Sequence, residues 1–189
     1  MKQGQKTQYK ILNHSNKLFY HIGYRKTTFS DIVKSTGMSQ GNITYHFKSK
    51  DDILIGVLNY RLEEIKKTFN DWDKTYHTPE LRLNQFIDFL IDDKKELIKY
   101  GCPHGTMATE LGKSNTSAKI LNQKIFNFII NWFSKQFETL HYSKEQSDML
   151  ALEFFSRGQG SCILGNIYND EKLFEKLVNG IRELIKQRS

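Results

Sequence analysis

The 189-residue sequence predicts an all-α protein, and three observations carry this prediction. Apolar residues recur at steps of three and four throughout the chain, which is the spacing of one helix face. Few stretches alternate with period two, as half-buried strands do. The composition of 38% hydrophobic and 26% charged residues, with two prolines and 12 glycines, is that of an ordinary globular chain and argues against disorder.

The first two helices are expected over about 6–22 and 30–36. Glycine suits the position after a helix, so Gly23 ends the first one. Either Thr28 or Ser30 caps the second, because their hydroxyls accept from otherwise unpaired amides. The apolar stripe of the first helix consists of Ile11, Leu12, Leu18, Phe19 and Ile22.

A glycine turn separates the second helix from a third. Gly37 supplies this turn, and Ser39 caps a short helix of about 40–46. Ser49 then caps a long helix that ends near residue 70. Two short helices around a glycine turn have the shape of a helix-turn-helix, so residues 27–54 are expected to read DNA.

Five more helices are expected beyond a polar loop around 73–77. Pro79 suits the first turn of a helix, and Ser143 with Gln146 resembles a capping box. Glycines and Pro103 interrupt the pattern at 100–105, and polar residues interrupt it at 112–115. The expected ranges are about 79–99, 105–112, 116–140, 144–168 and a last helix that starts at Asp170.

The net charge of +7 is concentrated at one end of the chain. Residues 1–50 carry nine Lys/Arg and one acid, hence +8, whereas residues 51–189 carry 19 Lys/Arg and 20 acids, hence −1. A polyanion is attracted to such a basic end, so nucleic acid is the expected partner. Charge alone does not exclude a solvated basic surface without a partner.

The composition also argues against membrane and secreted proteins. No apolar run approaches the roughly 20 residues that span a bilayer. The basic N-terminal stretch is not followed by an apolar one, as it is in a secretory signal. Two cysteines, Cys102 and Cys162, are too few for a disulfide framework. We therefore expect a cytoplasmic protein.

The helix over 40–46 is amphipathic on a helical wheel. Ile43 and Phe47 define its buried side. Gln and Asn side chains pair with adenine edges and Thr packs on thymine methyl groups, whereas Tyr, His and Lys suit phosphate oxygens. The small Gly41 lets the helix backbone approach the duplex. The outward residues are Gln40, Gly41, Asn42, Thr44, Tyr45 and His46.

Several spaced elements resemble the N-terminal domain of the TetR-type transcriptional repressors. They are Leu18-Phe19, Gly23-Tyr24, Thr27-Thr28, Asp31-Ile32-Val33, Gly37-Met38-Ser39, Gly41, Tyr45-His46-Phe47 and Lys50-Asp51-Asp52-Ile53-Leu54. The resemblance covers about 6–55, and beyond it the chain is similar only to the family's layout. It implies a helix-turn-helix DNA-binding domain over 1–50 and a helical ligand-binding and dimerisation domain over 51–189.

The resemblance also implies a function. A homodimer is expected to bind a palindromic operator in double-stranded DNA as a repressor, and to release it when a small-molecule effector binds the C-terminal core. Thr44 departs from the family, in which tyrosine is usual there, so its side chain reaches less far. Carried over by position, Thr28 touches phosphate, Gln40, Gly41, Asn42 and Thr44 face bases, and Tyr45, His46 and Lys50 hold the DNA backbone.

A ligand site is expected in the second domain, because such sites are mostly apolar with a few polar groups. For each single residue, packing in a core without a ligand is the alternative. Leu83, Glu110, Asn127 and Asn131 are further candidates. The expected ligand-binding residues are Phe86, Leu90, Cys102, His104, Met107, Leu111, Phe126, Ile129 and Phe133.

Cys102 carries an alternative hypothesis about the signal. A thiol near an imidazole can react with oxidants or electrophiles, so Cys102 beside His104 is a candidate redox or electrophile sensor. The opposing interpretation is an inert, partly buried thiol. Cys162 lies in an apolar helix and is expected to pack.

The last two helices are expected to form the dimer interface as a four-helix bundle with their twofold copies. Packing within one subunit is the alternative. The expected residues are Leu150, Phe154, Ile163 and Ile167 on one helix and the stripe over 173–185 on the other.

The sequence offers less support for other functions. Cys102 and His104 lack an orienting third group or an oxyanion loop, so neither an enzyme nor a catalytic residue is expected. The six histidines are scattered without paired-ligand spacing, so no metal site or cofactor is expected either. A non-specific nucleic-acid-binding protein and an activator remain open.

Overall fold

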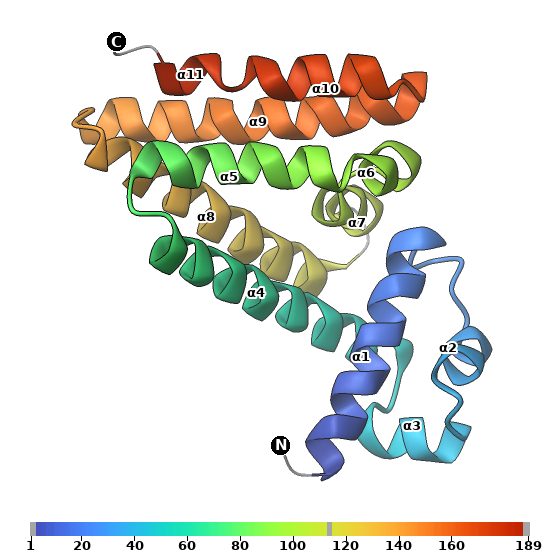
Figure 1. The fold of residues 1–189 in the computed structure, drawn as a ribbon. Helices are drawn as coiled ribbons and strands as arrows, with labels where there is room; N and C mark the ends of the chain where they lie inside the picture. The colour runs from blue at the N-terminus through green and yellow to red at the C-terminus, as the bar shows by residue number, and fades with distance from the viewer. Residues whose placement is uncertain (1–2, 113–114, 187–189) are drawn as a thin grey trace. The chain divides into compact units, whose positions relative to one another are not determined.

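The computed structural model describes residues 3–112 and 115–186, and within these ranges the chain forms eleven helices and no strand. The predicted all-α class is therefore confirmed. No helix in these ranges is long and apolar enough to cross a membrane. In chain order the helices are α1 (Gln3–His21), α2 (Phe29–Thr36), α3 (Gln40–His46), α4 (Lys50–Thr75), α5 (Pro79–Asp92), α6 (Lys94–Tyr100), α7 (Pro103–Leu111), α8 (Thr116–Thr139), α9 (Lys144–Tyr168), α10 (Glu171–Gly180) and α11 (Glu183–Lys186) (Figure 1).

Two compact units make up the fold. The first contains the chain up to Glu64 together with Thr106–Lys124, and the second contains Ile65–Gly105 and the chain from Ile125 onward. The chain passes from one unit to the other within α4, α7 and α8. The division into a DNA-binding domain over 1–50 and a ligand domain over 51–189 stays a prediction about function.

Helix α2 begins at a reciprocal cap. The Thr28 hydroxyl accepts the N–H of Asp31 at 3.2 Å, and the Asp31 carboxylate accepts the N–H of Thr28 at 2.8 Å. Thr28, and not Ser30, is therefore the capping residue. Gly37 ends the helix with φ of +67°, a left-handed conformation that glycine adopts without a steric penalty.

Helices α3 and α4 begin as predicted. The Ser39 hydroxyl accepts the N–H of Asn42 at 3.3 Å, and the Ser49 hydroxyl accepts the N–H of Asp52 at 3.0 Å. Aliphatic side chains from α1–α4 form the core of this unit, since each helix turns its apolar stripe inward. The wholly buried ones are Ile11, Ile32, Ile43, Ile53, Leu54, Val57 and Leu58.

Two helices predicted as continuous are broken in the second unit. The predicted helix over 79–99 forms α5 and α6, which meet at Asp93, and the last predicted helix forms α10 and α11. Apolar spacing shows which face of a helix is buried, but it does not reveal one or two non-helical residues that interrupt the helix. Neither break is therefore predicted by the sequence pattern. Helix α4 is longer than predicted and ends at Thr75. The break predicted at 112–115 includes residues 113–114, which lie outside the described ranges.

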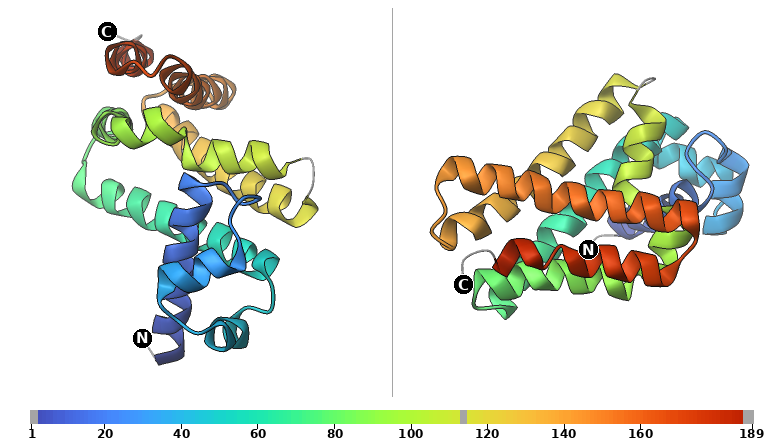
Figure 2. Two further views of the ribbon diagram at one scale, coloured as in Figure 1. Left: turned by 90° about the vertical axis from the view of Figure 1, so that its right-hand side faces the viewer. Right: turned by 90° about the horizontal axis from the view of Figure 1, so that it is seen from above.

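The second unit has an aromatic core. Helix α9 packs against α6 and α10, and α10 also packs against α5 and α6 (Figures 1 and 2). Phe133 and Phe154 are wholly buried, with ring centroids 4.9 Å apart, and Phe86 lies 4.8 Å from Phe133. Large rings bury much apolar surface, so this cluster helps to hold α5, α8 and α9 together.

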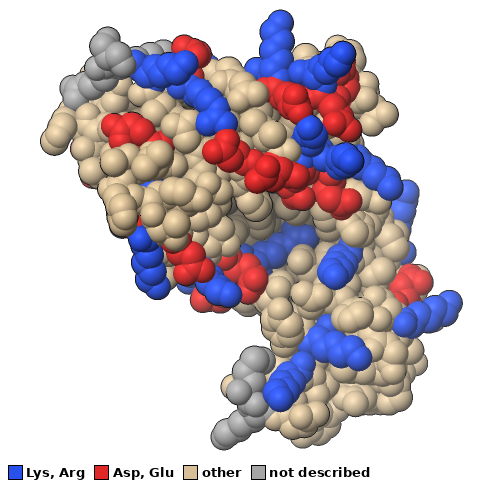
Figure 3. All heavy atoms as spheres, in the orientation of Figure 1, with Lys and Arg blue, Asp and Glu red and all other residues tan. Residues whose placement is uncertain are grey.

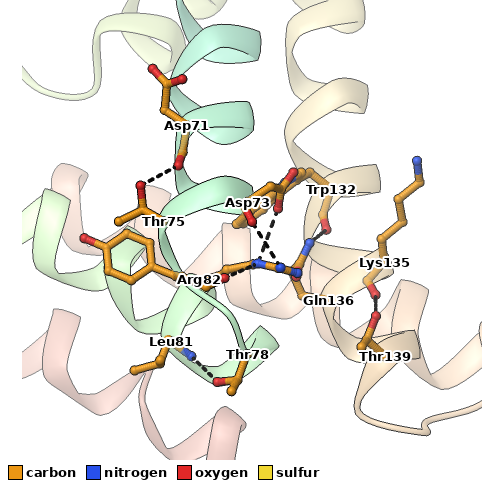
Figure 4. A network of polar contacts seen from close by, with 11 residues as sticks. Asp71, Asp73, Thr75, Thr78, Leu81, Arg82, Trp132, Lys135, Gln136 and Thr139 are labelled. Carbon is orange, nitrogen blue, oxygen red and sulfur yellow. Dashed lines mark hydrogen bonds and ion pairs between the residues drawn. The ribbon is translucent and has the colours of Figure 1, made fainter.

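Arg82 ties three segments of this unit to one another (Figure 4). Its guanidinium donates to the carbonyl oxygen of Asp73, in the last turn of α4, at 3.3 Å and to that of Tyr76, just after the end of α4, at 2.8 Å. It also donates to Gln136 Oε1 on α8 at 3.2 Å. The Asp73 carboxylate lies 3.5 Å from Arg82 Nε and accepts Trp132 Nε1–H at 3.1 Å. The planar donor fork of arginine suits such divergent acceptors.

Candidate nucleic-acid interface and ligand cavity

The outward face of α3 is polar and exposed, as the helical wheel predicted. Ile43 is wholly buried, whereas Gln40, Gly41 and Asn42 are exposed and Tyr45 keeps 77% of its surface. Thr44 and His46 are half-buried at its flanks. Such a strip of amide, aromatic and small residues suits base edges and phosphates.

The absence of a side chain at Gly41 has no internal cause. A Cβ placed there would meet no atom within 4 Å, so packing in the protein does not require glycine. Gly41 is also not in a left-handed conformation, unlike Gly37. The fold therefore does not require glycine here, and its small size leaves the helix backbone open to a close approach from outside.

Besides Thr28 in its capping box, two of the predicted DNA-contacting side chains bond within the protein. Thr44 Oγ1 donates to the carbonyl of Gln40 at 3.0 Å, so it lies along the helix backbone. Lys50 Nζ donates to the carbonyls of Tyr24 at 3.0 Å and Thr27 at 2.9 Å. An ammonium has three donors, so one remains for a phosphate.

The capping box of α2 lies at an exposed helix start. Thr28 is exposed, and hydrogen bonds from its hydroxyl and its backbone amide lower the pKa of the Asp31 carboxyl below its usual value.

Figure 3 shows Lys and Arg side chains with few acids over the visible face of α1–α3, and acids together with bases over α5, α6 and α10. This agrees with the charge division of the sequence and favours DNA at α1–α3.

An apolar cavity of about 130 Å³ lies within the second unit. A cavity of this order holds a single small aromatic ring. Its polar lining is confined to Thr68, Asp93, Cys102, His104 and Gln159. The apolar lining consists of Ile65, Phe69, Trp72, Phe86, Phe89, Leu90, Leu97, Pro103, Ile129, Phe155, Gly158 and Cys162.

The lining contains Phe86, Leu90, Cys102, His104 and Ile129 of the predicted ligand-binding residues. The other four predicted residues do not line the cavity, because their side chains pack elsewhere. Phe133 is wholly buried in the aromatic core, and Phe126 packs its ring on Phe155 at 5.2 Å. Met107 and Leu111 are buried in the other unit.

The sequence pattern missed several lining residues. Trp72 lies beyond the expected end of its helix, but α4 continues to Thr75 and brings Trp72 onto the lining beside Phe69. Asp93 is expected inside a continuous helix, so the sequence does not predict its place at a helix break on the cavity lining. A stripe carried past residue 70 at steps of three and four predicts that Trp72 shares a face with Ile65 and Phe69.

Both cysteines line this cavity, and neither forms a disulfide. The Cys102 sulfur accepts hydrogen bonds from Gln159 Nε2 at 3.3 Å and from the N–H of Gly105 at 3.5 Å. Burial raises the pKa of the Cys162 thiol, which keeps it protonated and unreactive. A sensing role of Cys102 stays a prediction.

Glu110 forms hydrogen bonds inside the first unit and does not line the cavity. Its carboxylate accepts the N–H of Tyr24 at 3.1 Å and the N–H of Arg25 at 2.7 Å, so α7 is bonded to the segment that leads from α1 to α2. Gly23 precedes these amides with φ of +92°, a backbone conformation that glycine adopts without a steric penalty. Asn127 and Asn131 are exposed and line no part of the cavity.

The apolar surface of α9 differs from the predicted dimer face. Phe154 and the residues Phe174, Val178, Ile181 and Leu184 are buried inside the unit, so they belong to its core. Ile163 and Ile167 are exposed, as predicted. The exposed apolar residues of α9 are Met149, Leu152, Ile163, Leu164, Ile167 and Tyr168.

Comparisons with known proteins agree on a class. The sequence model of "Bacterial regulatory proteins, tetR family" matches residues 11–57. The chain is 24% identical to an "Uncharacterized HTH-type transcriptional regulator in lacX 3'region" of Lactococcus lactis over 172 residues, covering 89% of this chain and 88% of that one. It is 44% identical to "HTH-type transcriptional regulator QacR" of Staphylococcus aureus over 57 residues, which are 30% of this chain and 29% of that one.

The fold is also similar to solved structures. The crystal structure of a TetR transcriptional regulator from Legionella pneumophila superposes with a TM-score of 0.81 and 25% sequence identity. The superposition covers 92% of this chain and 94% of that one.

Proposed function

The chain belongs to the TetR family of DNA-binding bacterial transcriptional regulators, and from this premise we propose that it is a repressor that binds a palindromic operator as a homodimer and is released by a small-molecule effector. The observation that carries the proposal is the exposed face of α3, on which Gln40, Gly41 and Asn42 have no internal role in packing. The second helix of such a pair lies in the major groove.

The proposed DNA contacts divide into two kinds. Gln40, Gly41, Asn42 and Thr44 face base edges, which specifies sequence. Contacts with phosphate position the protein and depend on salt. The phosphate contacts come from Thr28 at the exposed start of α2 and from Tyr45, His46 and Lys50.

A band-shift titration tests operator binding. The chain is titrated against DNA upstream of its own gene and against random DNA of equal length, at several salt concentrations. A palindromic site with half-sites about 34–36 Å apart should bind on the order of a thousandfold or more tightly than random DNA. Equal affinity for both DNAs would favour the non-specific alternative.

A homodimer follows from the need for two half-sites and is supported by the apolar surface of α9. A soluble monomer rarely leaves such a row of large apolar side chains in water. Two copies related by a twofold axis bury the same face of each other. The exposed apolar residues of α9 named above are the proposed interface.

Effector release is proposed to act through α7. This helix begins with Pro103 and His104, which line the cavity, and it carries Glu110, which holds the amides of Tyr24 and Arg25. A ligand in the cavity shifts α7, and Glu110 transmits the shift to α1 and α2. The separation of the two recognition helices changes, and operator affinity falls because half-site spacing is fixed by DNA geometry.

A further inference from the structure

The cavity contains one carboxylate and no lysine or arginine among its lining residues. Asp93 lies at the break between α5 and α6, one and two turns after Phe89 and Phe86, which also line the cavity. Residues at this spacing share one side of a helix, so the carboxylate follows a row of apolar side chains.

The Asp93 carboxylate is not used by the fold. It forms no cap for α6, although it stands at the capping position. The adjacent Lys94 is paired instead with Glu171 and Glu175. Among the described residues, no hydrogen bond or ion pair joins the Asp93 carboxylate to another group. Burial, together with the charge of Glu96, raises the pKa of this carboxyl, which means that its charge is poorly compensated.

Aromatic rings dominate the rest of the lining. Phe69 stacks on Trp72 with centroids 5.1 Å apart, and Trp72 meets Phe89 edge-to-face at 5.9 Å. Phe86 and Phe155 complete the set. Aromatic faces attract cations, and the attraction is stronger where water is excluded. An apolar cage with one uncompensated acid is thus complementary to a positive charge carried on an apolar body.

We propose that the cavity selects a small aromatic organic cation, whose charge pairs with Asp93 and whose ring packs among Phe69, Trp72 and Phe89. The inference rests on the proposed function, because it specifies the chemical class of the effector. A quaternary nitrogen cation fits best, since it has no N–H that would need a hydrogen-bond acceptor, and its charge alone pairs with the carboxylate.

Two isosteric probes test the charge preference. N-methylpyridinium and toluene have the same shape, a single ring with one methyl group, and differ only in the charged nitrogen. Each is titrated calorimetrically into the full-length protein without DNA. The cation should bind saturably, and the neutral hydrocarbon should bind about tenfold or more weakly. Equal affinities, tighter binding of the hydrocarbon, or no binding of the cation would overturn the proposal.

A pair of variants tests the role of Asp93. Asp93→Asn keeps the size of the side chain, and Asp92→Asn is a control at the exposed neighbouring residue, which does not line the cavity. Asp93→Asn should reduce affinity for the cation by about tenfold and leave that for the hydrocarbon unchanged, whereas Asp92→Asn should change neither. If Asp93→Asn unfolds at the same temperature as the parent and binds the cation with unchanged affinity, Asp93 does not pair with the cation and the proposal is wrong.

An assay of operator release by each probe distinguishes an error in the ligand class from an error in the proposed effector coupling. If the cation binds with the expected dependence on Asp93 but never weakens operator binding, the ligand class stands and the effector coupling fails. If the neutral probe binds at least as well and releases the operator, the coupling stands and the cation preference fails.

Discussion

Gly41 lies on the exposed face of α3 at a position where the protein does not need a glycine. We expect Gly41→Ala to leave the fold intact or to stabilise it by up to about 1 kcal/mol, because alanine favours helices. The added methyl group should hold the helix away from the groove and cost operator affinity on the order of one base contact, about 1–3 kcal/mol. Thermal unfolding and band-shift titration measure the two effects.

Gly180→Ala is the matched control for this prediction. A Cβ at Gly180 also meets no atom within 4 Å, and this residue lies at the end of α10. It should leave operator affinity unchanged. Equal operator binding by Gly41→Ala and the parent would show that α3 does not approach DNA at this position.

Glu110 accepts two backbone amides with two carboxylate oxygens. A glutamine has only one acceptor oxygen in its amide, so Glu110→Gln leaves one of these amides without its partner. Hydrogen bonds to charged groups contribute about 1.5–3 kcal/mol, and local opening should therefore increase amide exchange at Tyr24 or Arg25 by about tenfold or more. Unchanged exchange at both amides would remove Glu110 from the proposed coupling; the amides of α9 are the internal control.

At the scale of elements, Arg82 determines how the end of α4 and the loop after it are held against α8. Arg82→Met keeps the length of the apolar stem and removes every donor, leaving the Asp73 carboxylate and the Tyr76 carbonyl without that partner. We expect the free energy of unfolding to fall by about 1–2 kcal/mol, a value reduced for the partial exposure of the pair. Urea denaturation measures it.

Lys186→Met provides the comparison for Arg82. Lys186 pairs with Glu183 at 3.1 Å, and both side chains are about two-thirds exposed. Such an exposed pair is screened by water, so its loss should cost less than about 0.5 kcal/mol. Equal destabilisation by both substitutions would mean that the Arg82 network contributes no more than an ordinary surface ion pair.

At the scale of the whole molecule, the proposed dimer depends on the exposed face of α9. Ile163 is 59% exposed, so Ile163→Glu should not disturb the fold of one subunit. In a dimer the two carboxylates would be buried near each other, which should weaken association by about 3 kcal/mol or more, roughly a hundredfold. Sedimentation measures the dissociation constant, and operator binding should weaken with it.

Ile120→Glu controls for the added charge. Ile120 is 49% exposed and lies on α8, outside the proposed interface. It should leave the sedimentation of the protein unchanged. A dimer that survives Ile163→Glu and dissociates with Ile120→Glu would move the interface away from α9.

The local chemistry of the sequence determined the helix class, the caps at Ser39 and Ser49, and the outward face of α3, and it narrowed the cap of α2 to Thr28 or Ser30. These features depend on residues within one or two turns of each other, so spacing and side-chain type were sufficient. The charge division between the two ends of the chain is likewise a property of the sequence alone.

Only the tertiary structure decided which apolar residues form a core and which line a cavity. Phe133 and Phe86 have the same chemistry and similar helical settings, yet one is wholly buried and the other lines the cavity, because residues distant in sequence pack around them. The breaks at Asp93 and after Gly180, and the use of Glu110 as an acceptor for the amides of Tyr24 and Arg25, also depend on such contacts. Apolar periodicity identifies a buried face but not its neighbour, and for that reason the exposed face of α3 was predicted closely and the cavity lining only in part.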